Sequence, residues 1–172
     1  LSRLVASVRR TVRGAPATVL AYTLMEASLY QGLGGGGIRP VSFRLNDMER
    51  LRAVLDQAEG PGLRLFLTES VFSMDGDRAD LETLHALARQ YNAFLCVDEA
   101  HATGILGAQG KGLVAGRADL VGGTLSQGLG LVGALVSAPD ACCLLPGTHS
   151  TGASVSPVPA PPVPRAAASR RR

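Results

Sequence analysis

The segment Ala93-Phe94-Leu95-Cys96-Val97-Asp98-Glu99-Ala100-His101 decides the fold prediction, because an apolar run ends abruptly in charged residues. Residues 93–97 form a short continuous run of apolar side chains, as expected for a parallel strand that is covered on both faces. The charged residues fall just past the carboxyl end of that strand, which is where open α/β sheets place their ligands. We therefore predict that Asp98 and His101 belong to a ligand site.

Outward from this segment, apolar strand patterns alternate with helical patterns, which predicts an α/β fold with a mostly parallel sheet covered by helices. Two helices are expected from the apolar spacing in residues 48–55 and 81–91. Asn46-Asp47-Met48-Glu49 has the spacing of a capping box, with Asn46 as the cap of the first helix. Further strands are expected at Val19–Ala21, Ile38–Phe43, Leu63–Thr68, Leu120–Leu125 and Leu131–Val136.

Composition limits the classes of function. The chain has 172 residues, 46% of them hydrophobic, which suits one domain or a large piece of one. The formal net charge of +3 comes from the ends, because residues 15–140 hold nine Lys and Arg against fourteen Asp and Glu, a balance of −5. This distribution gives no evidence of a nucleic-acid surface. There is no apolar run long enough for a membrane span and no paired cysteine pattern, so we expect a reducing, cytoplasmic location.

The composition changes after Asp140. Residues 141–172 contain six Pro, many Ser, Thr and Ala, and a closing Arg170-Arg171-Arg172, with no hydrophobic period. We predict a disordered tail there. The predicted organisation is therefore a poorly matched N-terminal stretch over 1–20, a partial large domain over 21–140, and the tail over 141–172. The chain also lacks an initiating Met, and we expect it to be a fragment.

The sequence Asp98-Glu99-Ala100-His101 allows three interpretations. A DEAH-type nucleotide motor needs a G-x-x-x-x-G-K-[ST] phosphate loop upstream, and the sequence has none. A pyridoxal-phosphate site is the second, because a carboxylate at a strand end can keep the pyridine nitrogen protonated. The third is purely structural, with the acid capping the turn that follows. The surrounding sequence favours the pyridoxal-phosphate interpretation.

Several motifs in order carry a family resemblance. Glu69–Asp77 (ESVFSMDGD) precedes a helical pattern, Val97–Gly104 (VDEAHATG) follows it, and Gly107 and Gly110-Lys111-Gly112 come next. This run resembles the α-oxoamine synthase family, which includes 8-amino-7-oxononanoate synthases, 2-amino-3-ketobutyrate CoA ligases and serine palmitoyltransferases. The resemblance is strong over residues 39–140 and weaker over 21–32. It implies part of the large domain of a fold-type-I pyridoxal-phosphate enzyme.

The resemblance also implies roles for single residues. Asp98 would bind the pyridine nitrogen of pyridoxal 5′-phosphate, and Ala100 would pack against one face of the ring. His101 and Ser73 would contact the side of the ring that bears the hydroxyl. Thr124 would lie beside the cofactor. Ser73 and Thr124 also have a plainer interpretation, since short polar residues often satisfy the backbone of turns.

Two positions depart from the family pattern. The Schiff-base lysine of the family follows a segment that matches Thr124-Leu125-Ser126, and here that position is Gln127. An amide cannot form an imine with the cofactor aldehyde, so we expect non-covalent binding at best. Lys111 matches a different, basic loop position and is expected to be solvated. Glu26 stands where the family has a ring-stacking His, and a carboxylate cannot stack in this way.

The resemblance implies a transferase that condenses an amino acid with an acyl-CoA and releases carbon dioxide, closest in type to 8-amino-7-oxononanoate synthase. Because of Gln127, we expect no catalytic residue to be intact and the chain to be inactive. The family active site forms between two subunits, so a homodimer or a heterodimer with a family member is expected. An alternative is a non-catalytic partner subunit, and a distant one is a DEAH-type nucleotide-binding protein. No metal site is expected.

Overall fold

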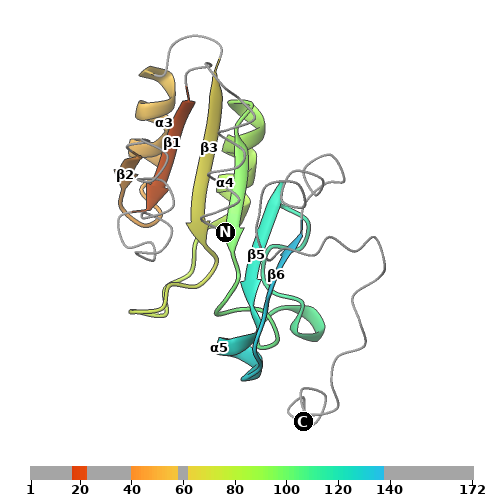
Figure 1. Ribbon diagram of the computed structural model, residues 1–172. Coiled ribbons are helices and arrows are strands. Elements are labelled where there is room, and N and C mark those ends of the chain that lie inside the picture. The colour runs from red at the N-terminus through yellow and green to blue at the C-terminus, as the bar shows by residue number, and fades with distance from the viewer. Residues whose placement is uncertain (1–16, 23–39, 58–61, 138–172) are drawn as a thin grey trace.

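The computed structural model describes residues 17–22, 40–57 and 62–137. Their strands form one sheet in the order β2-β1-β3-β4-β5-β6 (Figure 1). Neighbouring strands from β2 to β5 are parallel, and β6 pairs antiparallel with β5. The mostly parallel sheet predicted from the sequence is therefore confirmed. The strand bounds are β1 Ala17–Tyr22, β2 Val41–Phe43, β3 Leu63–Glu69, β4 Phe94–Asp98, β5 Leu120–Thr124 and β6 Ala134–Ser137.

Helices α3 (Met48–Gln57) and α4 (Leu81–Gln90) lie along the sheet, with α3 beside β1 and β2 and α4 beside β3 and β4 (Figure 1). Both bury an apolar stripe, since Leu51 and Leu55 of α3 and Leu84 and Leu87 of α4 are almost fully enclosed. These side chains join alternate residues of β1, β3 and β4 in one hydrophobic cluster. The helical spacing predicted for both segments is confirmed.

The central strands are buried on both faces. In β3, Leu65, Phe66 and Leu67 are each at most 2% exposed, although their side chains alternate between the two faces. In β4, residues 95–97 are equally enclosed. This burial explains the uninterrupted apolar runs in the sequence, because a strand that is covered on both faces has no solvent side to fill with polar residues.

The strand ends differ from the predictions in detail. The strand expected over Leu120–Leu125 ends at Thr124, because Leu125 begins the short helix α5 (Leu125–Leu129). The strand expected over Leu131–Val136 is shifted to β6. Apolar periodicity marks the strands, but it carries no information on direction, so the antiparallel edge strand did not follow from it.

The capping prediction for α3 is wrong. Asp47, not Asn46, caps the helix, since its Oδ1 accepts the backbone N–H of Arg50 at 3.0 Å. Asn46 adopts a left-handed backbone (φ 56°) and uses its side chain elsewhere. Its Oδ1 accepts the amide of Asp80 at 2.9 Å, and its Nδ2 donates to the carbonyl of Arg78 at 3.1 Å. Asn46 therefore joins the start of α3 to the start of α4.

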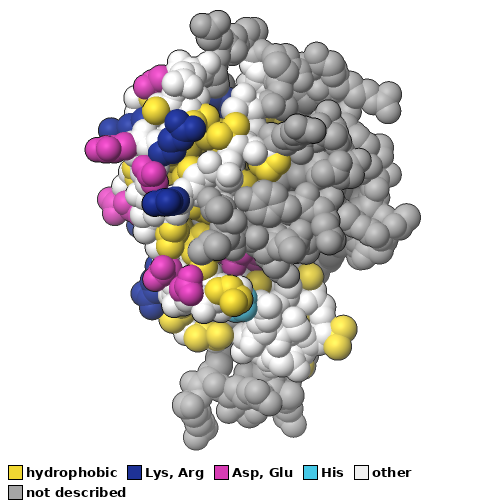
Figure 2. Space-filling view, turned by 90° about the vertical axis from the view of Figure 1, so that its left-hand side faces the viewer, with side chains coloured by type: hydrophobic (Ala, Val, Ile, Leu, Met, Phe, Trp, Pro, Cys, Tyr) yellow, Lys and Arg dark blue, Asp and Glu magenta, His cyan; other side chains and the backbone are white. Residues whose placement is uncertain are grey.

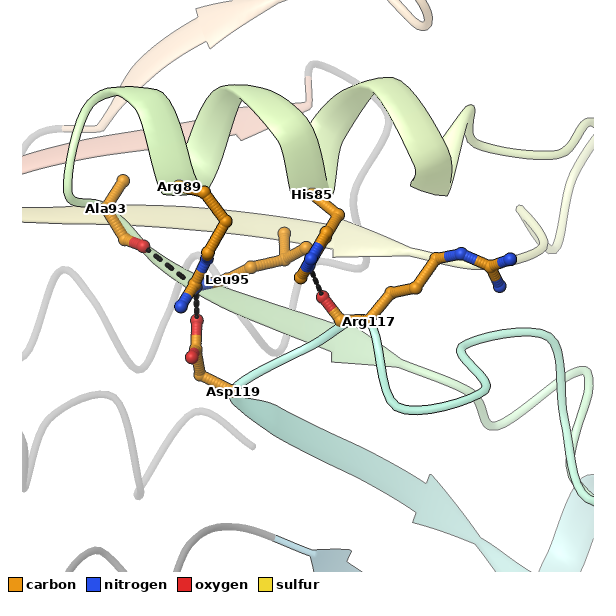
Figure 3. A network of polar contacts seen from close by, with 6 residues as sticks. All are labelled: His85, Arg89, Ala93, Leu95, Arg117 and Asp119. Carbon is orange, nitrogen blue, oxygen red and sulfur yellow. Dashed lines mark hydrogen bonds and ion pairs between the residues drawn. The ribbon is translucent and has the colours of Figure 1, made fainter.

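A polar network joins α4 to the amino ends of β4 and β5 (Figure 3). Asp119, just before β5, accepts the backbone N–H of Leu95 at 2.8 Å and pairs with Arg89 of α4. The amide of Asp119 donates back to the carbonyl of Leu95 at 2.9 Å. Nearby, Nδ1 of His85 donates to the carbonyl of Arg117 at 2.5 Å. These contacts fix the segment that enters β5.

Surface charge is mixed. Figure 2 shows acidic and basic side chains interspersed on the face that carries β2 and α3. Within the described ranges, no helix is long and apolar enough to cross a membrane. The predicted tail over 141–172 lies outside the described residues, as does most of the stretch over 1–20. Those two predictions, and the domain bounds built on them, stay predictions.

Candidate cofactor site

The carboxyl ends of β3, β4 and β5 lie side by side. Glu69 is paired with Asp98, and Asp98 in turn with Gly122, in the parallel register. Beyond the last strand residue, the amide of Ser70 donates to the carbonyl of Asp98 at 2.9 Å. The strand ends that carry Ser70 and Asp98 therefore lie next to each other at one edge of the sheet.

Asp98 ends β4 with a half-buried side chain. Its Oδ1 accepts the backbone N–H of Ala100 at 2.9 Å, which is the turn-capping role considered as the plain alternative. That bond occupies one oxygen only. Among the described residues, no donor bonds to Oδ2, so this oxygen can accept a hydrogen bond from a ligand.

The next residues form a tight turn that carries Ala100 and His101. The amides of Ala102 and Thr103 both donate to the carbonyl of Glu99, at 3.0 and 2.8 Å. Ala100 is 7% exposed, and His101 is half-buried with no hydrogen bond to any other described residue. The turn thus presents a small apolar side chain and an imidazole with unused hydrogen-bonding capacity next to Asp98.

Helix α5 follows β5 and rests against this turn. A Cβ at Gly104 would lie 2.6 Å from Cδ2 of Leu129, and a Cβ at Gly128 would overlap the carbonyl oxygen of Thr103. Only residues without a side chain allow so close an approach. Gln127 is on this helix and is exposed. The position of the family lysine is therefore carried by a helix held against the Asp98 turn.

Thr124 and Lys111 lie as follows. Thr124 is the last residue of β5 and the N-cap residue of α5, and its Oγ1 accepts the hydroxyl of Ser126 at 3.2 Å. It therefore stands at the same sheet edge as Asp98. Lys111 is exposed in the loop after the short 3₁₀ helix η1 (Ala108–Gly110), which agrees with the prediction of a solvated loop lysine.

Ser73 is exposed in the loop after β3. This loop is closed by a bridge between Val71 and Arg78 and by a bond from the amide of Phe72 to the carbonyl of Asp77 at 2.9 Å. No hydrogen bond joins Ser73 to the Asp98 turn within the described ranges, so its role stays a prediction. Glu26 lies outside the described residues.

Two further residues lie at this edge, and the family resemblance assigned neither of them a role. Ser70 is fully buried, and its Oγ has no hydrogen-bond partner in the described part of the chain. A buried hydroxyl of this kind is unusual and marks a place where a ligand group or water would be stabilised. Glu99 is 3% exposed and binds two backbone amides of a later loop. The sequence feature that could have pointed to Glu99 is its position directly after Asp98, because successive side chains along a strand point to opposite faces of the sheet.

The described residues contain no group of three or more His, Cys, Asp and Glu side chains that could hold a metal ion. The donor set at the edge consists of one available carboxylate oxygen, one imidazole and short hydroxyls. Such a set suits a flat, polar, nitrogen-containing ring: Asp98 can accept from a ring N–H, and Ala100 leaves room for the ring face. The exposed amide of Gln127 offers no group that could bond covalently to an aldehyde.

Several curated proteins are similar to this chain in sequence. The 8-amino-7-oxononanoate synthase of Gluconacetobacter diazotrophicus is 50% identical over 133 residues, which are 76% of this chain and 33% of that protein. The Geobacter sulfurreducens 8-amino-7-oxononanoate synthase is 45% identical over 70% of this chain and 32% of its own length. The chain thus spans about a third of these relatives' length.

Solved structures agree with the sequence relatives. Serine palmitoyltransferase from S. paucimobilis, described with a bound PLP–myriocin aldimine, superposes with a TM-score of 0.73 at 31% identity, over 88% of this chain and 41% of that one. The family model for aminotransferase class I and II matches residues 18–171. The resemblance stated from the motifs is confirmed, and the chain belongs to the aminotransferase class I and II family.

Proposed function

We propose that this chain is the cofactor-binding part of a pyridoxal-phosphate-dependent acyltransferase of the 8-amino-7-oxononanoate synthase type, and that it holds the cofactor without a covalent bond. One observation carries the proposal: Asp98 stands at the carboxyl edge of the sheet with one carboxylate oxygen open to a ligand. The family resemblance supplies the reaction type, the condensation of an amino acid with an acyl-CoA.

The residues at the edge fit the ring of pyridoxal phosphate. When bound, this cofactor supplies an electron sink for bonds at the amino-acid α-carbon. Asp98 would accept a hydrogen bond from the protonated ring nitrogen, and its charge would favour that protonated form. Ala100 would pack against the ring. His101 and Ser73 would contact the ring hydroxyl, and Thr124 would contribute a hydroxyl from the end of β5.

Position 127 limits what the site can do. Gln127 lies on a helix that packs against the Asp98 turn, so a lysine at this position would extend from a rigid part of the backbone near the site. Glutamine occupies the position without an amine. The chain therefore binds the aldehyde form of the cofactor and has no group at this position that forms the covalent link or moves the α-proton.

Borohydride trapping tests the proposal. The full chain is incubated with pyridoxal phosphate, reduced with borohydride and mapped by mass spectrometry, beside the variants Gln127→Lys and Gln90→Lys. We expect a change in cofactor absorbance on binding, no adduct in the native chain, and a specific adduct at position 127 in Gln127→Lys. Gln90→Lys adds the same amine to an exposed helix end far from the site and should gain no adduct.

Two outcomes would count against the proposal. A specific adduct at Lys111 of the native chain would contradict non-covalent binding. Absence of any cofactor binding, in the native chain and in Gln127→Lys alike, would contradict the cofactor site itself.

A second candidate is a non-catalytic partner subunit. It is favoured by the combination of a well-formed Asp98 turn with a replaced lysine, since a partner needs the fold and not the amine. Co-expression with a tagged, lysine-bearing 8-amino-7-oxononanoate synthase tests it. Stable co-purification at a fixed ratio would favour this role, and strict isolation as a monomer would contradict it.

A further inference from the structure

Glu99 is a buried carboxylate to which neither the resemblance nor the proposed function gives a role. It follows Asp98 directly, yet its side chain is only 3% exposed. Its Oε1 accepts the backbone amides of Leu113 and Val114, at 2.5 and 3.0 Å. A buried carboxylate is costly unless such donors compensate its lost hydration, so these two bonds hold the loop firmly to the end of β4.

The loop over residues 104–114 approaches this carboxylate closely. At Gly112 the backbone has φ +89°, and a Cβ would overlap Oε2 of Glu99. Glycine is therefore required twice, for the left-handed backbone and for the close approach. The amide of Gly112 also donates to the carbonyl of Leu106 at 3.0 Å, and that of Gly104 donates to the carbonyl of Gly110 at 2.9 Å. The segment 104–114 thus folds back on itself and returns to Glu99.

The backbone of Glu99 holds the other parts of the site. Its amide donates to the carbonyl of Gly122 in β5 at 2.7 Å. Its carbonyl accepts the amides of Ala102 and Thr103, which closes the turn that carries His101. This turn also supports α5, because the carbonyl of Thr103 lies close to Gly128. One residue therefore links β5, the turn and the 104–114 loop.

We propose that Glu99 is a positioning residue of the cofactor site: by binding the Leu113 and Val114 amides through its buried carboxylate, it fixes the turn that sets Ala100 and His101 relative to Asp98. This inference rests on the proposed function for its ligand. The Glu99 carboxylate binds the amides of Leu113 and Val114. It acts through the orientation of the turn.

The test compares Glu99→Gln and Glu99→Leu with Glu82→Gln, a control that removes the same charge from an exposed position on α4. Glutamine keeps one acceptor oxygen, whereas leucine removes both. Bonds to a charged acceptor are the stronger ones, so we expect the dissociation constant for pyridoxal phosphate to rise roughly threefold in Glu99→Gln and roughly tenfold in Glu99→Leu. The induced circular dichroism of the bound cofactor should change in both.

Two further readouts on the cofactor-free chain keep the test decisive. Hydrogen exchange at the Leu113 and Val114 amides reports the anchor, and the ring proton signals of His101 report the turn. We expect faster exchange and shifted His101 signals in Glu99→Gln, which should remain folded. Faster exchange with unchanged His101 signals and unchanged cofactor dichroism would overturn the proposal, because the anchor would then be broken without moving the turn.

Failure of the proposed function looks different. In that case neither the native chain nor the Glu82→Gln control binds pyridoxal phosphate. The His101 signals of Glu99→Gln still decide whether Glu99 positions the turn, since they need no ligand.

Discussion

An aspartate lies near each end of β4, Asp119 near the amino end and Asp98 at the carboxyl end, and the two make different contacts. At the amino end, Asp119 accepts the amide of Leu95 and pairs with Arg89, and its own amide returns a bond to Leu95 (Figure 3). At the carboxyl end, Asp98 accepts one local amide, and its other oxygen bonds to no donor among the described residues. Within the same part of the chain, the side chains of Ser70 and His101 have no hydrogen-bond partner either.

The difference separates stability from binding. A network whose donors and acceptors satisfy one another holds the chain together and has no capacity left for a ligand. An edge with unused acceptors and hydroxyls is less stable than it could be, a cost that folded proteins accept at functional sites. Mutation of the amino-end network should therefore act through unfolding, whereas mutation of the side chains that face a ligand at the carboxyl end, such as Asp98, should act through ligand binding.

The largest effect is expected for Gly112→Ala, which tests whether the carboxyl edge has a rigid support. The new methyl would meet the Glu99 carboxylate and strain a left-handed backbone, so the free energy of unfolding should fall by about 3 kcal/mol. Urea unfolding followed by circular dichroism measures it. Gly116→Ala is the matched control, because Gly116 has a similar φ of +79° but open space around it. It should cost about 1 kcal/mol. Equal losses in the two variants would mean that the Glu99 contact is unimportant.

Asp119→Ala should break the amino end. It leaves the amide of the buried Leu95 without its carboxylate acceptor, which costs about 2 kcal/mol of unfolding free energy. The ion pair contributes little of this, since Arg89 is about half exposed. Arg89→Ala should therefore cost clearly less than Asp119→Ala in the same urea titration. Equal losses in the two variants would show that the ion pair dominates the network.

Asp98→Asn should change binding and leave stability almost unaltered. Asparagine keeps an acceptor for the Ala100 amide, so the unfolding free energy should stay within about 0.5 kcal/mol of the native value. It loses the charge that stabilises a protonated ring nitrogen, so the affinity for pyridoxal phosphate should fall about tenfold, or about 1.4 kcal/mol. Absorbance titration measures this. A variant that unfolds readily but binds normally would reverse the assignment of the two ends.

The smallest effect concerns Tyr22, the last residue of β1 at the carboxyl edge. Its ring packs against Phe43 and Phe72, and burial raises the pKa of its hydroxyl well above the usual value near 10. The raised pKa means that the folded chain keeps the proton while the unfolded chain releases it. Stability from this group is therefore complete below about pH 10 and is lost as the pH rises further.

The matched variant isolates that contribution. Tyr22→Phe should be nearly as stable as the native chain at pH 8 and should lose roughly 1 kcal/mol less of its unfolding free energy between pH 10 and pH 11. Parallel pH dependence in the two proteins would show that the Tyr22 hydroxyl reaches solvent in the folded state.

The sequence predicted the central strands and both long helices because their signal is local. The apolar run in residues 93–97 and the helical spacing of Leu84, Leu87 and Ala88 reflect burial directly. The cap of α3 could not be predicted in the same way. The side chain of Asn46 forms hydrogen bonds with Asp80 and Arg78, which lie more than thirty positions away along the chain. A short sequence motif cannot predict such a contact.

The site was predicted in part for the same reason. Asp98 and His101 follow from their position just past a strand end, which a parallel sheet brings to one edge with other strand ends. Ala100 and Thr124 were named only through the family resemblance. The role of Glu99 depends on the return of the 104–114 loop, which is a tertiary event. The glycines of that loop were visible in the sequence, but what they approach was not.

The mixed direction of the sheet also affects the order in which its parts can form. β5 and β6 are joined by residues 125–133 alone, whereas β1 and β3 are separated along the chain by residues 23–62, which include β2 and α3. Short loops close at lower entropic cost and sooner than long ones. In pulsed hydrogen exchange, we expect the backbone amides of the β5–β6 ladder, such as the Thr124–Ala134 pair, to be protected first. The amides of the β1–β3 ladder, such as the Ala21–Leu67 pair, should be protected later. Helix α5, which carries Gln127, would then form before β1 and β3 have paired.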